Sequence, residues 1–158
     1  MDVLLVNPNR MKPAVAPIGL DYLADALVEH GHRVELLDLC FENDPEVAVQ
    51  ARLRRSRAGL IGVSLRNTDD CYFASQQCFL PQYQQVIEWL REASDAPIVL
   101  GGVGYSVMPE AVLRRVGGDL GVAGDGEAAM AGLADRIARG ESWDDLPGLV
   151  YRRDGRMV

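Results

Sequence analysis

Short apolar runs alternate with amphipathic helical patterns along almost the whole of this 158-residue chain. The apolar runs lie at residues 3–6, 34–38, 60–64, 98–100 and 120–123, and the helical patterns that follow them begin at Pro17, Asp44, Pro81, Pro109 and Ala128. An uninterrupted apolar strand needs cover on both faces, and each intervening helix can return the chain to start a parallel neighbour. The pattern therefore predicts an α/β fold with a five-stranded parallel sheet and helices on both faces.

The expected topology is flavodoxin-like (Rossmann-like), with the strand order 2-1-3-4-5. Residues 1–139 form one predicted domain. The tail at residues 140–158 differs, because Leu149-Val150-Tyr151 is followed by Asp154-Gly155, a dipeptide typical of tight hairpin turns. We expect this tail to be a linker with a short C-terminal β-hairpin.

Composition excludes several classes of partner. The net charge is −7, whereas nucleic acids and anionic membranes attract Lys and Arg. No apolar stretch approaches the roughly 20 residues that span a bilayer. The cysteines Cys40, Cys71 and Cys78 are odd in number and irregular in spacing, as expected for reduced thiols in a cytoplasmic protein. We expect a cytoplasmic protein that binds neither nucleic acid nor membrane.

Four unusual loops follow the predicted strands, at residues 7–18, 64–79, 101–106 and 124–127. Open parallel sheets bind ligands beyond the carboxyl ends of their strands, where these loops lie. Glycines directly after a strand let a ligand approach the backbone closely. Ordinary strand-to-helix turns would explain one glycine cluster, but clusters after two neighbouring strands favour a site for a long, flat or phosphate-bearing ligand. Gly101-Gly102-Val103-Gly104 is not in register with a dinucleotide fingerprint, and the chain has no P-loop.

The order and spacing of these loop motifs carry a family resemblance. The motifs are Val3–Pro8, Gly62–Asn67, Gly101–Ser106, Gly124–Glu127 and Leu146–Tyr151. Together they make the chain similar to the N-terminal cobalamin (vitamin B12)-binding domain of cobalamin-dependent radical SAM enzymes. The resemblance implies a flavodoxin-like domain that holds cobalamin in its base-off form, with the dimethylbenzimidazole tail buried between the sheet and the helices.

The resemblance also implies the cofactor-binding residues. Ser64, Gly101, Gly102 and Gly104 would line the groove for the tail, and Gly124, Gly126 and Glu127 would border the tail or the edge of the corrin. Leu65, Arg66 and Asn67 would lie under the lower face of the corrin, and Asn7, Pro8, Tyr105 and Ser106 complete the expected set.

No protein ligand to cobalt is expected. The motif D-x-H-x-x-G, in which a histidine binds cobalt, is missing, and His30 and His32 belong to the opposite edge of the predicted sheet. Arg66 is the candidate for the lower face of the metal, where a guanidinium that keeps its proton is a poor ligand. A salt bridge from Arg66 to Asp69 or Asp70 is an equally good interpretation.

The chain lacks the C-x-x-x-C-x-x-C motif that holds a 4Fe-4S cluster in radical SAM enzymes. The cluster and S-adenosylmethionine are therefore expected only in a missing radical SAM domain, in cis or in trans, and no catalytic residue is assigned here. The predicted role is to carry a methyl group on cobalt between S-adenosylmethionine and a substrate. The alternative is a flavodoxin-like domain that binds flavin or a nucleotide, or mediates an interaction without catalysis.

Overall fold

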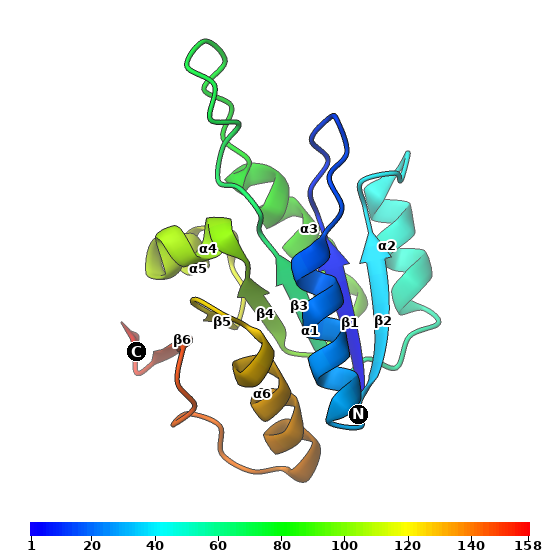
Figure 1. The fold of residues 1–158 in the computed structure, drawn as a ribbon, viewed down its shortest axis with the longest axis vertical. Helices are drawn as coiled ribbons and strands as arrows, with labels where there is room; N and C mark the ends of the chain where they lie inside the picture. The colour runs from blue at the N-terminus through cyan, green and yellow to red at the C-terminus, as the bar shows by residue number, and fades with distance from the viewer.

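The computed structural model describes residues 1–158, which form one mixed sheet covered by helices (Figure 1). The strands are β1 (Asp2–Asn7), β2 (Arg33–Asp38), β3 (Leu60–Ser64), β4 (Ile98–Gly101), β5 (Leu120–Val122), β6 (Leu149–Arg153) and β7 (Arg156–Met157). The helices are α1 (Ile18–Glu29), α2 (Pro45–Leu53), α3 (Leu80–Ala93), α4 (Val103–Val107), α5 (Pro109–Val116) and α6 (Glu127–Arg139). None of these helices is both long and apolar enough to cross a membrane.

The sheet has the order β2-β1-β3-β4-β5-β6-β7, with the first five of these strands parallel. This confirms the predicted order of the parallel strands. The prediction of a five-stranded sheet was wrong, because β6 pairs antiparallel with β5 through Leu120 and Tyr151. The expected C-terminal hairpin is present, and Asp154 and Gly155 at its turn have positive φ angles of 50° and 78°, as a type I′ turn requires.

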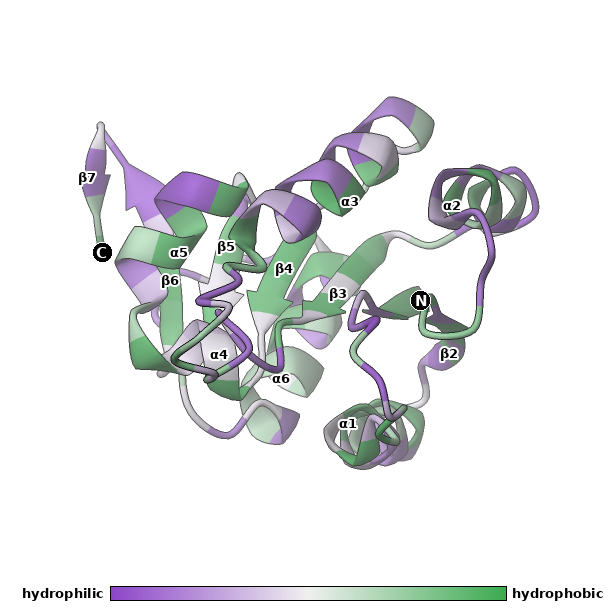
Figure 2. Ribbon diagram, turned by 90° about the horizontal axis from the view of Figure 1, so that it is seen from above, coloured by the Kyte–Doolittle hydropathy of each residue, from purple (hydrophilic) through white to green (hydrophobic).

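Two hydrophobic cores lie on opposite faces of the sheet, as strand alternation requires. Helices α1 and α6 cover one face, where Leu20 and Met130 pack on Val99 and Val122. Helices α2, α3 and α5 cover the other (Figure 2). The parallel strands β1, β3, β4 and β5 are thus buried on both sides, which accounts for their continuous apolar runs, whereas the edge strand β2 is largely exposed.

Local signals set the helix ends. The Asp44 carboxylate accepts a hydrogen bond from the Val47 N–H at 3.1 Å, and Pro45 follows at the first turn of α2. Gly117 ends α5 in the left-handed conformation that favours glycine. The loops from β1 to α1 and from β3 to α3 extend furthest beyond the carboxyl edge of the sheet (Figure 1).

Candidate functional site

A groove opens between α1, α6 and the carboxyl half of the sheet, with a cavity of about 330 Å³. Its walls come from the first turns of α1 and α6, and its base comes from β3, β4 and β5. The lining residues are Gly19, Leu20, Leu23, Gly62, Val63, Ser64, Val99, Leu100, Gly101, Gly102, Val103, Ser106, Val122, Gly124, Asp125, Gly126, Glu127 and Met130. The three loops singled out around Ser64, Gly101 and Gly124 therefore converge on one rim.

The groove exists because small residues occupy one face of β3 and β4. Gly62 is the register partner of Val99, and Ser64 is the partner of Gly101. These positions alternate with side chains that pack into the opposite core, so the α1/α6 face carries no large side chain at Gly62, Ser64 and Gly101. A Cβ atom at Gly101 would meet nothing nearer than the Val122 carbonyl oxygen, 3.9 Å away. The space is therefore built into the backbone.

The ends of β3 and β4 approach each other closely at Gly102. This residue has a φ of +93°, and a Cβ atom there would lie 2.8 Å from the Leu65 carbonyl oxygen and 3.0 Å from Ser64 Oγ. The Leu65 N–H donates to the Gly101 carbonyl at 2.7 Å. Only glycine satisfies both the dihedral angle and the contact, so Gly102 fixes the rim.

Ser106 joins the two glycine clusters. Its hydroxyl donates to the Gly102 carbonyl oxygen at 3.0 Å and accepts from the Gly124 N–H at 3.0 Å. The side chain also lines the groove. One hydroxyl therefore holds the β4 and β5 loops at a fixed separation.

The structure brings half of the predicted residues together at the groove and places the others elsewhere. Those that line it are Ser64, Gly101, Gly102, Ser106, Gly124, Gly126 and Glu127. Gly104 does not line it, because a Cβ there would lie 2.9 Å from the Asn67 backbone, and this contact packs α4 onto the segment after β3. Leu65 is fully buried in the core on the opposite face, so its side chain is not exposed at the rim.

Tyr105 also belongs to the core on the α3 side of the sheet. It is fully buried, and its ring lies against Gly121, where a Cβ atom would come within 2.2 Å of Tyr105 Cζ. Burial raises the pKa of the Tyr105 hydroxyl, which has no hydrogen-bond partner. The Tyr105 side chain therefore lies on the other face of the sheet from the groove and does not line it.

Asn7 and Pro8 lie outside the groove. Asn7 is buried, donates through Nδ2 to Asp38 Oδ1 at 2.9 Å and accepts from the Asn9 N–H at 3.2 Å. These bonds shape the β1–α1 loop. Pro8 lines a second cavity, of about 670 Å³, with residues such as Lys12 and Tyr83.

Arg66 is exposed at the carboxyl edge. Asp69 and Asp70, its expected alternative partners, are occupied within their own loop. Asp69 accepts from the Cys71 N–H at 2.7 Å, a bond that lowers the pKa of the carboxyl. Asp70 is bonded by the Ser75 hydroxyl, which lowers its pKa, and by the Tyr72 N–H at 3.1 Å. The salt bridge is therefore not formed.

Asn67 follows on the same loop, and its backbone connects this loop to α3. Its carbonyl accepts a hydrogen bond from the Tyr83 hydroxyl at 2.9 Å, which ties the loop to α3. The Asn67 amide nitrogen lies 3.6 Å from Met11 Sδ. The residue is half-buried beside the rim and does not line the groove.

The two histidines lie at the amino edge of the sheet, opposite the groove, as predicted. His30 Nδ1 lies 2.8 Å from one Asp135 oxygen, and His32 Nε2 lies 3.3 Å from the other. Burial lowers the pKa of His32. Neither imidazole can reach a ligand in the groove.

Sequence reasoning missed the residues that form the floor and the α1 wall, which include Leu20, Leu23, Gly62, Val99 and Met130. Their signal was present in the spacing. Gly62 precedes Ser64 by two residues and so faces the same side of β3. Met130 lies about one turn into α6 from Glu127, and Leu23 about one turn into α1 from Gly19.

An open, mostly parallel sheet with a groove at the carboxyl edge of its parallel strands defines a flavodoxin-like ligand-binding domain. The chain belongs to the B12 binding domain family, whose family model matches residues 9–134.

Individual relatives agree with this family. The chain is 40% identical over 154 residues to a tryptophan 2-C-methyltransferase from Streptomyces laurentii, covering 96% of this chain and 26% of that protein. It superposes with a TM-score of 0.96 and 38% identity on the radical S-adenosylmethionine methyltransferase TsrM from Kitasatospora setae, solved with cobalamin and a [4Fe-4S] cluster bound. That match covers 99% of this chain and 28% of TsrM.

A more distant structure shares the fold alone. The cobalamin-dependent S-adenosylmethionine radical enzyme OxsB, solved with aqua-cobalamin bound, superposes with a TM-score of 0.73 at 23% identity and matches 99% of this chain and 22% of OxsB. The chain thus spans about a quarter of the length of the relatives that it matches.

Proposed function

We propose that this chain is the cobalamin-binding module of a radical SAM methyltransferase. The observation that carries the proposal is the groove between α1 and α6, whose rim is formed by Ser64, Gly101 and Gly124. Membership of the B12 binding domain family supports it, as does the likeness to a methyltransferase solved with cobalamin. In this proposal S-adenosylmethionine and the iron–sulfur cluster bind to a separate radical SAM domain in cis or in trans.

The size and lining of the groove suit the nucleotide arm of cobalamin. Ligand cavities in proteins measure roughly 300–1,000 Å³, so about 330 Å³ holds a nucleotide-sized group but not a complete corrin. The corrin would remain outside, over the carboxyl edge, where the lining residue Val103 is exposed. The glycines at the rim leave room for the link between the arm and the ring.

The protein residues in this arrangement bind, orient and exclude water. Bound cobalamin supplies a cobalt centre that can carry a methyl group. The groove would hold the base of the nucleotide arm, and Ser106 keeps the two glycine loops in place. Arg66 is exposed and without an acidic partner, and we place it toward the lower face of the corrin. Its charge would favour the electron-rich metal, and its retained proton prevents ligation.

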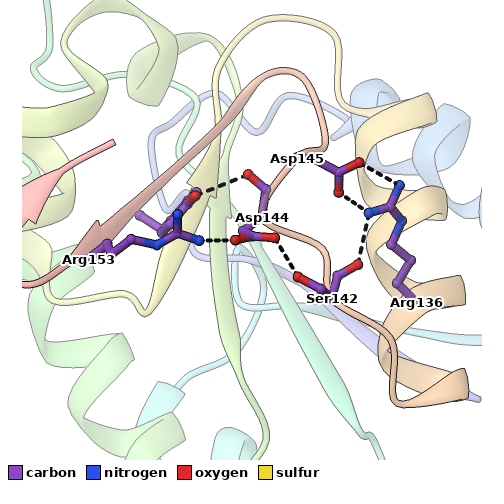
Figure 3. Close-up of polar contacts among 6 residues, drawn as sticks. Arg136, Ser142, Asp144, Asp145 and Arg153 are labelled. Atoms are coloured by element: carbon purple, nitrogen blue, oxygen red, sulfur yellow. Dashed lines mark hydrogen bonds and ion pairs between the residues drawn. The ribbon is translucent and has the colours of Figure 1, made fainter.

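The proposed domain division puts the cofactor site in residues 1–139 and a connection to the radical SAM domain in residues 140–158. Side-chain contacts connect this segment to α6 and to β6 (Figure 3). Arg136 of α6 donates to the Ser142 carbonyl at 2.8 Å and pairs with Asp145. Asp144 bonds the Ser142 hydroxyl and pairs with Arg153 of β6. Arg136 therefore ties the start of this segment to α6, and Asp144 ties it to β6 within the segment itself.

The remaining parts of the proposal concern the cell and other partners. We place the protein in the cytoplasm, where the free thiols of Cys40, Cys71 and Cys78 would stay reduced. The acidic net charge of −7 favours neither nucleic acid nor an anionic membrane as a partner.

The test is a titration of the chain with hydroxocobalamin, followed by absorbance. We expect saturable binding of one equivalent and a spectrum of the base-off form. Gly101→Val should abolish binding without unfolding the chain, because its side chain would enter open space in the groove, and Gly101→Ala should weaken binding less. A folded chain that does not bind cobalamin but retains flavin or a nucleotide would contradict the proposal and favour the alternative ligand class.

A further inference from the structure

The polar and apolar parts of the groove are separated by depth. Its polar side chains, Ser64, Ser106, Asp125 and Glu127, all lie at the rim, where strands end or helices begin. The rest of the lining comes from residues before the strand ends and from the apolar faces of α1 and α6. This floor consists of Leu20, Leu23, Gly62, Val99 and Met130.

The floor offers no hydrogen-bonding side chain. Val99 and Met130 are each only 2% exposed and Leu20 is 4% exposed, and all three belong to the core on this face. Gly62 and Val99 occupy paired positions in the sheet, where β3 pairs with β1 and β4, so their main-chain N–H and C=O groups face neighbouring strands and not the groove. At the rim, the Ser106 hydroxyl is already bonded on both sides. A group that reaches the floor therefore finds only apolar contacts.

Met130 defines the bottom of the groove. Its terminal methyl lies 3.0 Å from the position that a Cβ atom on Gly62 would occupy, so the thioether side chain covers the bare backbone of β3. Leu23 approaches from α1 on the other side and is half-buried. A flat apolar ring inserted between the two helices would contact both side chains.

We propose that this floor selects among cobamides by their lower base, accepting a benzimidazole and disfavouring a purine such as adenine. The inference rests on the proposed function and adds the class of cofactor that the groove admits. A benzimidazole brings a hydrocarbon edge to the floor. Adenine brings an exocyclic amino group and additional ring nitrogens, which lose water there without gaining a partner. An unsatisfied buried polar group of this kind weakens binding about tenfold to a hundredfold.

The experiment compares three probes on the same chain by absorbance titration: cobalamin, adeninylcobamide and cobinamide, which has no nucleotide arm. We expect cobalamin to bind at least about tenfold more tightly than adeninylcobamide. Equal affinities for these two would overturn the inference and leave the proposed function intact. No binding of cobalamin would overturn the proposed function itself, and cobinamide binding as tightly as cobalamin would show that the arm does not enter the groove.

Variants of the floor make the test specific. Met130→Gln introduces an amide of similar length and should narrow the preference for cobalamin over adeninylcobamide, whereas the control Met130→Leu should preserve it. Leu23→Gln serves the same purpose at a less buried position if Met130→Gln does not fold. An unchanged preference in a folded glutamine variant would show that the floor does not contact the base and would contradict the proposal.

Discussion

Replacing Ser106 with alanine removes the one side chain that connects both glycine loops of the groove. The hydroxyl makes two hydrogen bonds of 3.0 Å, to the Gly102 carbonyl and from the Gly124 N–H. Each such bond contributes about 0.5–1.5 kcal/mol net. The Gly124 bond lies in an exposed position where water can replace the hydroxyl, so its contribution belongs at the low end. We expect a total loss of about 1–2 kcal/mol, shared between the stability of the rim and the binding of the nucleotide arm.

The assay measures the dissociation constants of cobalamin and cobinamide, together with the free energy of unfolding in denaturant. If the whole loss appears in binding, the affinity of Ser106→Ala for cobalamin should fall about 5- to 30-fold. Cobinamide affinity should change little, because it lacks the arm that the rim surrounds. Ser106→Thr keeps the hydroxyl and should restore most of the cobalamin affinity.

Two results would refute this reasoning. If Ser106→Ala matched the wild type in both cobalamin affinity and unfolding free energy, the two hydrogen bonds would have no role in shaping the rim. If cobalamin and cobinamide lost affinity equally, the serine would act on the corrin or on the fold and not on the arm.

Three further predictions concern regions outside the groove. Tyr105→Phe should raise the unfolding free energy by about 1 kcal/mol, measured by denaturant melts, because the buried hydroxyl has no partner; a marked loss of stability would contradict this. The lowered pKa of His32, caused mainly by burial, means that the unfolded chain binds this proton more readily, so stability should fall as the pH drops below 6.5. His32→Gln should reduce the slope of the unfolding free energy with pH below pH 6.5. An unchanged slope would show that other groups cause it. Asp144→Ala should release the segment before β6 to proteolysis while cobalamin affinity stays constant, because the contacts to Arg153 and Ser142 lie far from the groove.

Much of the fold could be predicted from the sequence because its signals are local. The continuous apolar run Val3–Val6 predicted a strand buried on both faces, and the structure places it in β1, an interior strand between β2 and β3. The extension of the sheet by β6 could not be predicted, since its register with β5 joins residues about thirty positions apart and depends on how residues 140–148 turn back. The local Asp154-Gly155 signal predicted the hairpin but not its pairing with β5.

The rim of the groove was easier to predict than its floor, for a physical reason. Gly101, Gly102 and Gly124 stand out in the sequence because glycine directly after a strand indicates a positive φ angle or a close approach to the backbone. In the sequence, Leu23 and Met130 look like ordinary core residues of an amphipathic helix. They become candidate ligand contacts only because the facing strands carry small residues, which leaves space for a ligand. Strand alternation accounts for the position of Leu65, because residues 61, 63 and 65 face one core while Gly62 and Ser64 face the groove.

The same strands thus serve stability on one face and leave space on the other. The core under α2, α3 and α5 contains 20 buried residues, against 14 in the core under α1 and α6, and Ile61, Val63 and Leu100 belong to the larger one. Their neighbours Gly62, Ser64 and Gly101 have small or no side chains and so make few packing contacts on the face where the groove lies. Because an unfilled apolar space forgoes dispersion contacts, a ligand that fills it should stabilise the α1/α6 face more than the opposite face. Amide hydrogen exchange in α1 and α6 should accordingly slow on addition of cobalamin while that in α2 changes little, and equal protection of both layers would show that the groove is not where the ligand binds.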